Sequence, residues 1–136
     1  MSTEYRDDLV SYRIERALEC VKDAEMDIST GSLHSAANRL YYAIFSAMRV
    51  LLARDGVDFS KHSSVISYFR RQYIKTGIIE VRFSELIRNA ESIRNDCDYK
   101  DFYTPEQNEL EEQLSIAKEF IVCIENLIKE AFISCP

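Results

Sequence analysis

The chain has 136 residues, of which 46% are hydrophobic and 29% are charged, with three glycines and two prolines. That composition is typical of a folded domain, and it excludes a disordered or collagen-like chain. The net charge of −6, taken alone, argues against a nucleic-acid partner.

Several common sequence signals are missing. Neither GxGxxG nor GxxxxGKS/T occurs, so the usual phosphate-binding loops are excluded. No apolar run approaches the roughly 20 residues of a membrane helix, and the first eight residues are too polar for a signal peptide. We therefore expect a cytoplasmic protein without membrane contact, forming a single domain over residues 1–136.

The cysteines and histidines do not suggest a metal centre. No two cysteines form a CxxC pair, and neither histidine lies at a zinc-ligand spacing from a cysteine. We expect no metal and no cofactor. The four cysteines, which we expect to be free thiols, are Cys20, Cys97, Cys123 and Cys135.

Glycine and proline positions divide the chain into helices. Gly31, Gly56 and Gly77 each separate two apolar-periodic segments, as expected just past helix C-termini. Thr104 and Pro105 predict the N-cap and first residue of the last helix. The five predicted helices cover residues 6–30, 33–54, 63–75, 79–97 and 105–132.

The apolar pattern of these helices predicts how they pack. The first helix has one apolar stripe, whereas apolar residues cover most of the circumference of the second, which we expect at the centre. The third is short, and the fourth and fifth each carry a regular stripe that ends near Cys97 and Ala131, respectively. No segment alternates with period two, so we predict an all-α fold, an up-and-down helical bundle of four long helices and one short helix.

The net charge hides an uneven distribution. Residues 32–94 hold ten Lys or Arg and five Asp or Glu, whereas the rest of the chain holds seven and eighteen. Solvated helix faces explain this in the ordinary way. The alternative is a basic groove for a phosphate-bearing ligand on the second to fourth helices. Its candidate residues are Arg39, Arg49, Arg70, Arg71, Lys75, Arg88 and Arg94.

The end of the fourth predicted helix gathers polar groups that suit phosphate chemistry. Arg94 and Asn95 lie there beside Asp98 and Tyr99, and an arginine can clamp a phosphate or stabilise a developing phosphoryl charge. The alternative is that Arg94 pairs with Asp98 at i,i+4 and only stabilises the helix end.

A second cluster lies on the second predicted helix. Arg39 and Tyr42 share a face at i,i+3 and need polar partners in a helix this apolar. We interpret Tyr41 and Phe45 as core residues. His62, beside the start of the third helix, is expected to cap it or to form a hydrogen bond rather than to act as a ligand or base.

Taken together, these segments resemble the HEPN superfamily, above all its small stand-alone domains with an arginine–aspartate–tyrosine motif. The resemblance covers residues 7–132. The matching segments are residues 36–45, His62, residues 75–77, Arg94, and Asp98 with Tyr99.

The resemblance implies a bundle of about five helices that forms a homodimer, with Arg94 near the dimer cleft. Many HEPN domains are metal-independent endoribonucleases that use an arginine and a following histidine separated by four to six residues. Others work with a minimal nucleotidyltransferase as toxin and antitoxin, or as non-catalytic RNA-binding or scaffold modules. Here the positions expected for the histidine hold Tyr99, Lys100 and Asp101.

The missing histidine matters because RNA cleavage by attack of the 2′-hydroxyl requires a base with a pKa near neutrality. Histidine, with an ordinary pKa of about 6.5, meets this requirement. We therefore predict a HEPN-like protein that binds RNA or a nucleotide. It would act together with a nucleotidyltransferase in a toxin–antitoxin-like system. An endoribonuclease acting across a homodimer and a non-catalytic interaction module are the alternatives, so catalysis stays open.

The site residues follow from the resemblance. It assigns catalytic roles to Arg94, Asp98 and Tyr99, and phosphate binding to Arg94, Asn95 and Arg39. Tyr42 and His62 would support them. Tyr99 would be the tyrosine that such a partner adenylylates, with Tyr103 as the second candidate.

Overall fold

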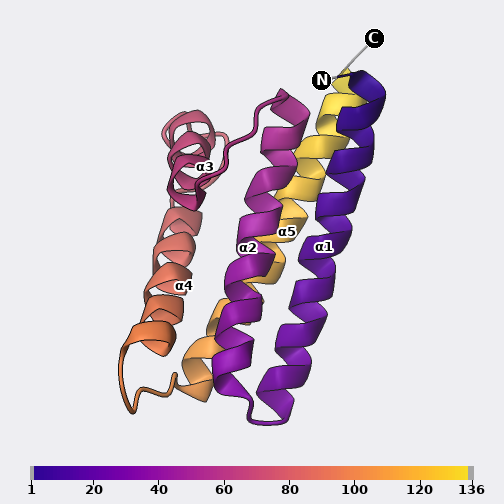
Figure 1. Ribbon diagram of the computed structural model, residues 1–136. Coiled ribbons are helices and arrows are strands. Elements are labelled where there is room, and N and C mark those ends of the chain that lie inside the picture. The colour runs from indigo at the N-terminus through magenta and orange to yellow at the C-terminus, as the bar shows by residue number, and fades with distance from the viewer. Residues whose placement is uncertain (1, 135–136) are drawn as a thin grey trace.

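The structure, a computed structural model, describes residues 2–134, with side chains described for residues 2–130. Among these residues it is all-α and contains no strand. In Figure 1 the four long helices run alternately down and up, so that both termini lie at the same end of the bundle. This confirms the predicted fold class. The elements are α1 (Thr3–Ser29), α2 (Leu33–Asp55), α3 (His62–Phe69), the π-helical turn η1 (Arg70–Ile74), α4 (Arg82–Tyr99) and α5 (Gln107–Ser134).

Helix α2 occupies the centre of the bundle, as its nearly all-round apolar pattern predicts. It packs against α1, α3, α4 and α5, whereas α1 and α4 lie on opposite sides of it and do not touch. Most of its residues between Ala36 and Ala53 are buried. The few partly exposed ones, such as Tyr42 and Arg49, therefore stand out against an apolar background.

Three phenylalanine rings hold the two sides of the bundle together. Phe120 of α5 meets Phe69 of α3 edge-on at 5.7 Å between ring centroids and Phe83 of α4 at 5.1 Å. All three side chains are fully buried. Because rings of this size bury 150–250 Å² each, this contact fixes α3 and α4 against α5 and thereby positions α4 beside α2.

The glycines end helices as predicted. Gly31 and Gly56 adopt φ of 78° and 74°, and the residue after each donates back to the helix, from Ser32 to the carbonyl of Asp27 and from Val57 to that of Leu52. These bonds form the glycine-dependent helix ending called the Schellman motif. Gly77 also has a positive φ, of 79°.

The prediction at the start of the last helix is wrong by two residues. Helix α5 begins at Gln107, and its first backbone bond runs from the Leu110 amide to the Glu106 carbonyl at 3.1 Å. Pro105 lies before the helix and is buried. Packing of this proline against the bundle, rather than its suitability as a first helical residue, decides its place.

Two further expectations can be compared with the structure. Within the described part of the chain no helix is long and apolar enough to cross a membrane. Cys20, Cys97 and Cys123 are free thiols, as predicted. Cys135 lies outside the described residues, and so does the side chain of Ala131.

Candidate functional site

The guanidinium of Arg94 lies against two tyrosine rings where α4 packs on α2. Its central carbon is 4.6 Å from the ring centroid of Tyr41 and 5.4 Å from that of Tyr42. Nη2 also donates to the Tyr42 hydroxyl at 3.5 Å, which is a long and weak hydrogen bond. The side chain keeps 26% of its surface exposed. The cation is therefore held chiefly by ring faces at the edge of the bundle.

The predicted pair between Arg94 and Asp98 is present but long. Nε of Arg94 and Oδ2 of Asp98 are 4.0 Å apart, and Asp98 is about half exposed. Nε is buried and has no hydrogen-bond partner. A buried donor without a partner is uncommon and asks for an explanation. Since this carboxylate satisfies Arg94 so poorly, the guanidinium retains donors for an anion.

His62, the first residue of α3, belongs to the same cluster. Its Nδ1 is 3.2 Å from the hydroxyl of Tyr41, and its ring centroid is 4.2 Å from that of Phe45. It also meets the ring of Tyr42 edge-on at 6.1 Å. His62 and Arg94 thus contact the same pair of tyrosines although they come from different helices. We call Arg94, Tyr41, Tyr42, Phe45 and His62 the arginine–histidine cluster.

Charges around the cluster keep His62 neutral. Partial burial, and then the positive charges of Arg94 and Arg49, lower the pKa of His62, while Glu91 acts in the opposite direction. Burial and the nearby Glu91 raise the pKa of the Tyr41 phenol. At neutral pH the cluster therefore contains a neutral imidazole hydrogen-bonded to a neutral phenol.

An open pocket of about 350 Å³ adjoins the cluster on the side of His62. Arg49 lies 5.9 Å from the ring centroid of Phe45 and forms an ion pair with Asp58 at 3.6 Å. A second cation, Arg13, donates to the backbone carbonyl of Arg49 at 2.8 Å. The pocket therefore offers a positive group and aromatic rings beside the imidazole. Its lining residues are Phe45, Arg49, Asp58, Phe59, Ser60 and His62.

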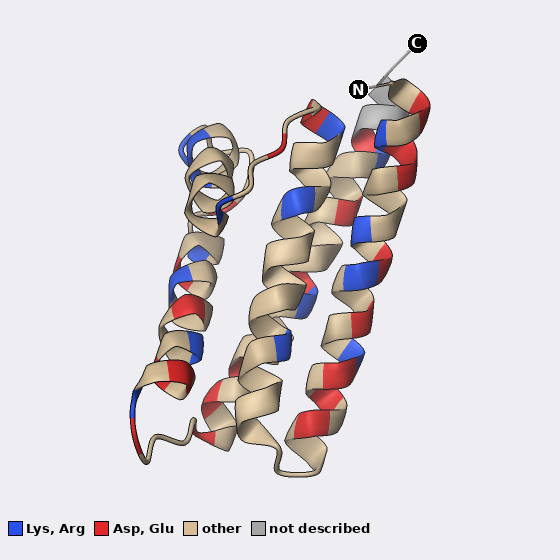
Figure 2. Ribbon diagram, in the orientation of Figure 1, with Lys and Arg blue, Asp and Glu red and all other residues tan. Residues whose placement is uncertain are grey.

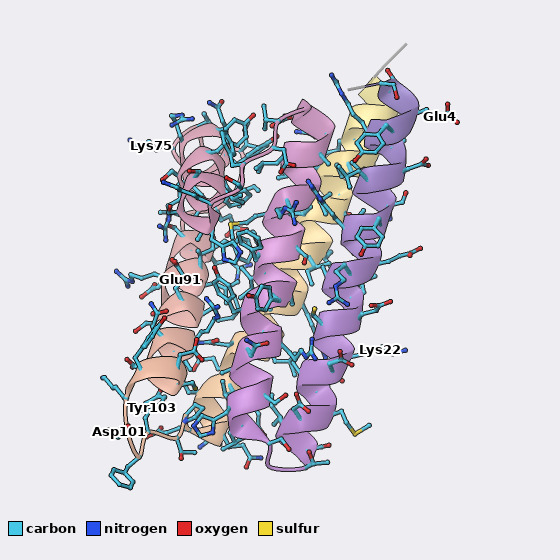
Figure 3. All side chains as sticks on the ribbon, viewed as in Figure 1. Glu4, Lys22, Lys75, Glu91, Asp101 and Tyr103 are labelled. Carbon is cyan, nitrogen blue, oxygen red and sulfur yellow. The ribbon has the colours of Figure 1, made fainter. Side chains whose placement is uncertain are left out.

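Other predicted site residues lie outside the cluster. Arg39 lies close enough to Cys20 of α1 to influence its thiol pKa, and Asn95 is exposed on α4. Tyr99 is 83% exposed. Tyr103 is partly buried in the loop that follows α4, at the end opposite Lys75 (Figure 3), and its backbone carbonyl pairs with Nε2 of His34 at 2.7 Å.

The basic residues proposed for a groove do not all converge. They are distributed over α2, η1 with the residue that follows it, and α4, whereas acidic residues line α1 and α5 (Figure 2). Arg49 and Arg94 both influence His62. Arg70 instead donates to the side chain and carbonyl of Ser84, which ties η1 to α4. Arg88 pairs with Glu85 on the surface.

Sequence reasoning missed Glu91 as part of the site, proposed Arg49 only for a basic groove, and treated Tyr41 and Phe45 only as core. A signal was available for each. Tyr41, Phe45 and Arg49 follow one another at four-residue spacing, and Glu91 precedes Arg94 by three residues on α4 (Figure 3). Among the described residues no group of three or more His, Cys, Asp or Glu is placed to hold a metal ion.

Together these features define an all-α bundle with a cationic and aromatic site between its second and fourth helices. Residues 10–127 match the HEPN domain, and the chain belongs to the HEPN family. It is 33% identical over 125 residues to a protein of Thermotoga maritima named "UPF0332 protein", covering 92% of this chain and 95% of the relative.

Two relatives from Methanocaldococcus jannaschii are each named "Putative toxin". One is 29% identical over 117 residues, covering 86% of this chain and 87% of the relative. The other is 30% identical over 86 residues, covering 63% and 58%, respectively.

Proposed function

We propose that this HEPN protein binds the phosphate backbone of RNA at the arginine–histidine cluster and acts as the toxin-type member of a pair with a nucleotidyltransferase. The observation that carries the proposal is the state of Arg94. Its guanidinium is held by two tyrosine rings, its hydrogen bond to Tyr42 is 3.5 Å long, and its side chain remains 26% exposed. An RNA phosphate supplies the acceptors that the protein does not.

The adjoining pocket suits RNA better than an isolated phosphate. Phe59, which is 38% exposed, offers ring surface for a base, and Arg49 offers a second cation. Asp58 and Glu91 limit the positive potential, because they face Arg49 and His62, respectively. The site is therefore one for a few contacts with RNA, with modest salt dependence, rather than a long basic groove.

The biological role rests on the relatives and on the exposed tyrosine. Two relatives carry toxin names. Tyr99 is 83% exposed at the end of α4, five residues after Arg94, whereas Tyr103 is partly buried and its pKa is raised by burial. An exposed hydroxyl is the one that a modifying partner can reach. In this proposal a homodimer is the active form, and adenylylation of Tyr99 by the partner neutralises it.

RNA binding is tested by fluorescence anisotropy with a labelled single-stranded oligonucleotide, using R94A and R88A. Both arginines lie on α4, but Arg88 is 69% exposed and paired only with Glu85 at the surface. R94A should weaken binding at least about 10-fold, because the charge-assisted hydrogen bonds from the partly buried guanidinium to the phosphate are lost. R88A should bind like the wild type.

Three outcomes decide between the alternatives. Equal affinity of R94A and wild type would contradict RNA binding at this site. If ATP displaces the labelled RNA at a far lower concentration than unlabelled RNA does, the ligand is instead a nucleotide. A change in the melting temperature of R94A without any change in RNA, nucleotide or partner binding would indicate a purely structural module.

The pairing is tested by co-expression with a nucleotidyltransferase and by intact-mass measurement. We expect a nucleotide adduct on the wild type and on Y103F, and none on Y99F. An adduct that persists in Y99F would mean that another residue is modified. The absence of an adduct on the wild type would contradict adenylylation by this partner. Light scattering of the purified protein should give twice the mass of 15.8 kDa.

A further inference from the structure

The neutral histidine of the cluster has no task in RNA binding alone. On the basis of the RNA binding proposed above, we propose that His62 is a catalytic residue that accepts the proton of an RNA 2′-hydroxyl next to a phosphate held by Arg94. It would take the place of the histidine that is missing after Arg94. The geometry differs from the sequence motif, because His62 begins α3, thirty-two residues before Arg94.

Packing rather than sequence spacing brings the two groups together. Tyr41 contacts both, with its ring under the Arg94 guanidinium and its hydroxyl 3.2 Å from Nδ1 of His62. The segments between them are fixed by the central position of α2, which contacts α3 and α4. A phosphate on Arg94 would therefore lie on the same tyrosine pair that His62 touches.

The surroundings of His62 leave one ring nitrogen free. Nδ1 faces the Tyr41 hydroxyl, whereas Nε2 has no hydrogen-bond partner among the described residues. The residue is exposed and lines the pocket of about 350 Å³, so substrate can reach it. When Nδ1–H donates to Tyr41, the lone pair remains on Nε2, which is the form that a base requires. Tyr41 is thus a positioning residue.

The charges that face His62 suit a base at neutral pH. Arg94 on α4 and Arg49 on α2 lower its pKa together with burial, and Glu91 on α4 opposes them. From the loop before α3, Asp58 adds a negative charge to the pocket, where it pairs with Arg49. The imidazole is therefore unprotonated at pH 7, and the flanking guanidiniums favour the developing negative charge on phosphorus oxygens.

The proposed step conserves atoms and protons. The 2′-oxygen gives its proton to Nε2 of His62 and forms a bond to phosphorus, while the bond from phosphorus to the 5′-oxygen breaks. The leaving 5′-oxygen takes a proton from water in the open pocket, and the imidazolium returns its proton to the solvent. The products are a 2′,3′-cyclic phosphate and a 5′-hydroxyl end.

The position after Arg94 is a weaker candidate for this role. Tyr99 is 83% exposed and contacts none of the cluster rings. A phenolic hydroxyl is also a weaker proton acceptor than the nitrogen of a neutral imidazole. His62 therefore combines the better chemistry with the closer connection to Arg94.

The test compares wild type, H62A and H34Q for binding and cleavage of one labelled RNA, in buffer with EDTA to suppress contaminating metal-dependent nucleases. At saturating enzyme, where all the RNA is bound whatever the affinity, H62A should cleave at least about 100-fold more slowly than the wild type. Added imidazole should restore part of the rate, because the vacated position is exposed. H34Q is the matched control, since His34 lies at the loop contact with Tyr103 and should leave cleavage unchanged.

A pH profile adds a readout that a structural role would not affect. Cleavage by wild type should rise with pH through the pKa of His62, and E91Q should move that rise to lower pH because Glu91 raises this pKa. Wild-type RNA binding without cleavage, or an unaltered rate in H62A, would overturn the catalytic role and leave RNA binding intact. Failure of the wild type to bind RNA would overturn both proposals.

Discussion

Arg54 of α2 and Arg94 of α4 both lie against tyrosine rings, but the protein provides them with very different hydrogen-bond partners. Arg54 donates to the Tyr73 hydroxyl at 2.9 Å and to the carbonyl of Leu127 at 3.4 Å, and its Nε is 3.7 Å from Asp55. Asp55 in turn accepts from Tyr73 at 2.6 Å and from Tyr68 at 3.0 Å. This Arg54–Asp55 network ties the end of α2 to α3, η1 and α5.

Arg94 has no comparable set of partners. Its hydrogen bond to the Tyr42 hydroxyl is 3.5 Å long, its ion pair with Asp98 measures 4.0 Å, and its Nε is buried without an acceptor. Fully connected polar networks stabilise a fold, whereas a cation that is positioned but unsatisfied is suited to an external anion. The comparison therefore separates a structural arginine from a functional one by their hydrogen bonds rather than by their neighbours.

The largest effect that tests this comparison is expected at Asp55. Asp55→Ala removes the acceptor of two tyrosine hydroxyls and the partner of Arg54, so we expect a loss of about 3 kcal/mol in unfolding free energy. Urea unfolding followed by circular dichroism measures it. A loss below about 1 kcal/mol would mean that water replaces the network and that it does not hold α3 in place.

Two matched Tyr→Phe substitutions, each of which removes one hydroxyl, should give the next largest difference in unfolding free energy. Tyr73→Phe should cost about 1–1.5 kcal/mol, because the hydroxyl both donates to Asp55 and accepts from Arg54. Tyr42→Phe should cost less than about 0.5 kcal/mol of stability, because its single contact with Arg94 is long. The same urea titration compares the two. Equal losses would show that the two arginines are held alike.

Much of the fold was predictable because helix periodicity and glycine positions are local properties. The all-round apolar pattern of residues 33–54 predicted the central helix, and the positive φ values of Gly31 and Gly56 follow from glycine's freedom there. The start of α5 was not predictable in the same way. Burial of Pro105, which depends on the whole bundle, outweighs its local preference.

The site was predictable only in part. Arg94 was predicted from its motif and Tyr42 from helix spacing, because each signal lies within the sequence of a single helix. The hydrogen bond between Tyr41 and His62 joins residues 21 apart across the loop before α3, and no periodicity reports such a contact. Arg49 joined the site for the same reason, because its influence on His62 depends on where that loop places the imidazole.

The pH dependence of stability offers a smaller test of the arginine–histidine cluster. The native pKa of His62 is lowered by burial and by Arg94 and Arg49, so the unfolded chain binds a proton more readily. Stability should therefore fall as the pH drops from about 6.5 through the native pKa. Urea unfolding of wild type and H62Q at several pH values isolates this contribution. The wild type should lose more stability than H62Q, and parallel curves would contradict the lowered pKa.

The smallest expected change in stability concerns Asp98, which is the counterpart of Asp55 in the comparison. Its carboxylate is half exposed and 4.0 Å from Nε of Arg94, so Asp98→Ala should alter unfolding free energy by less than about 0.5 kcal/mol. RNA affinity should instead increase two- to threefold, because removal of a negative charge beside Arg94 favours the phosphate. Urea titration and RNA anisotropy measure the two effects on the same preparation. A loss of affinity would mean that Asp98 orients the guanidinium despite the long distance, whereas a gain would show that Tyr41 and Tyr42 suffice to hold Arg94 for its ligand.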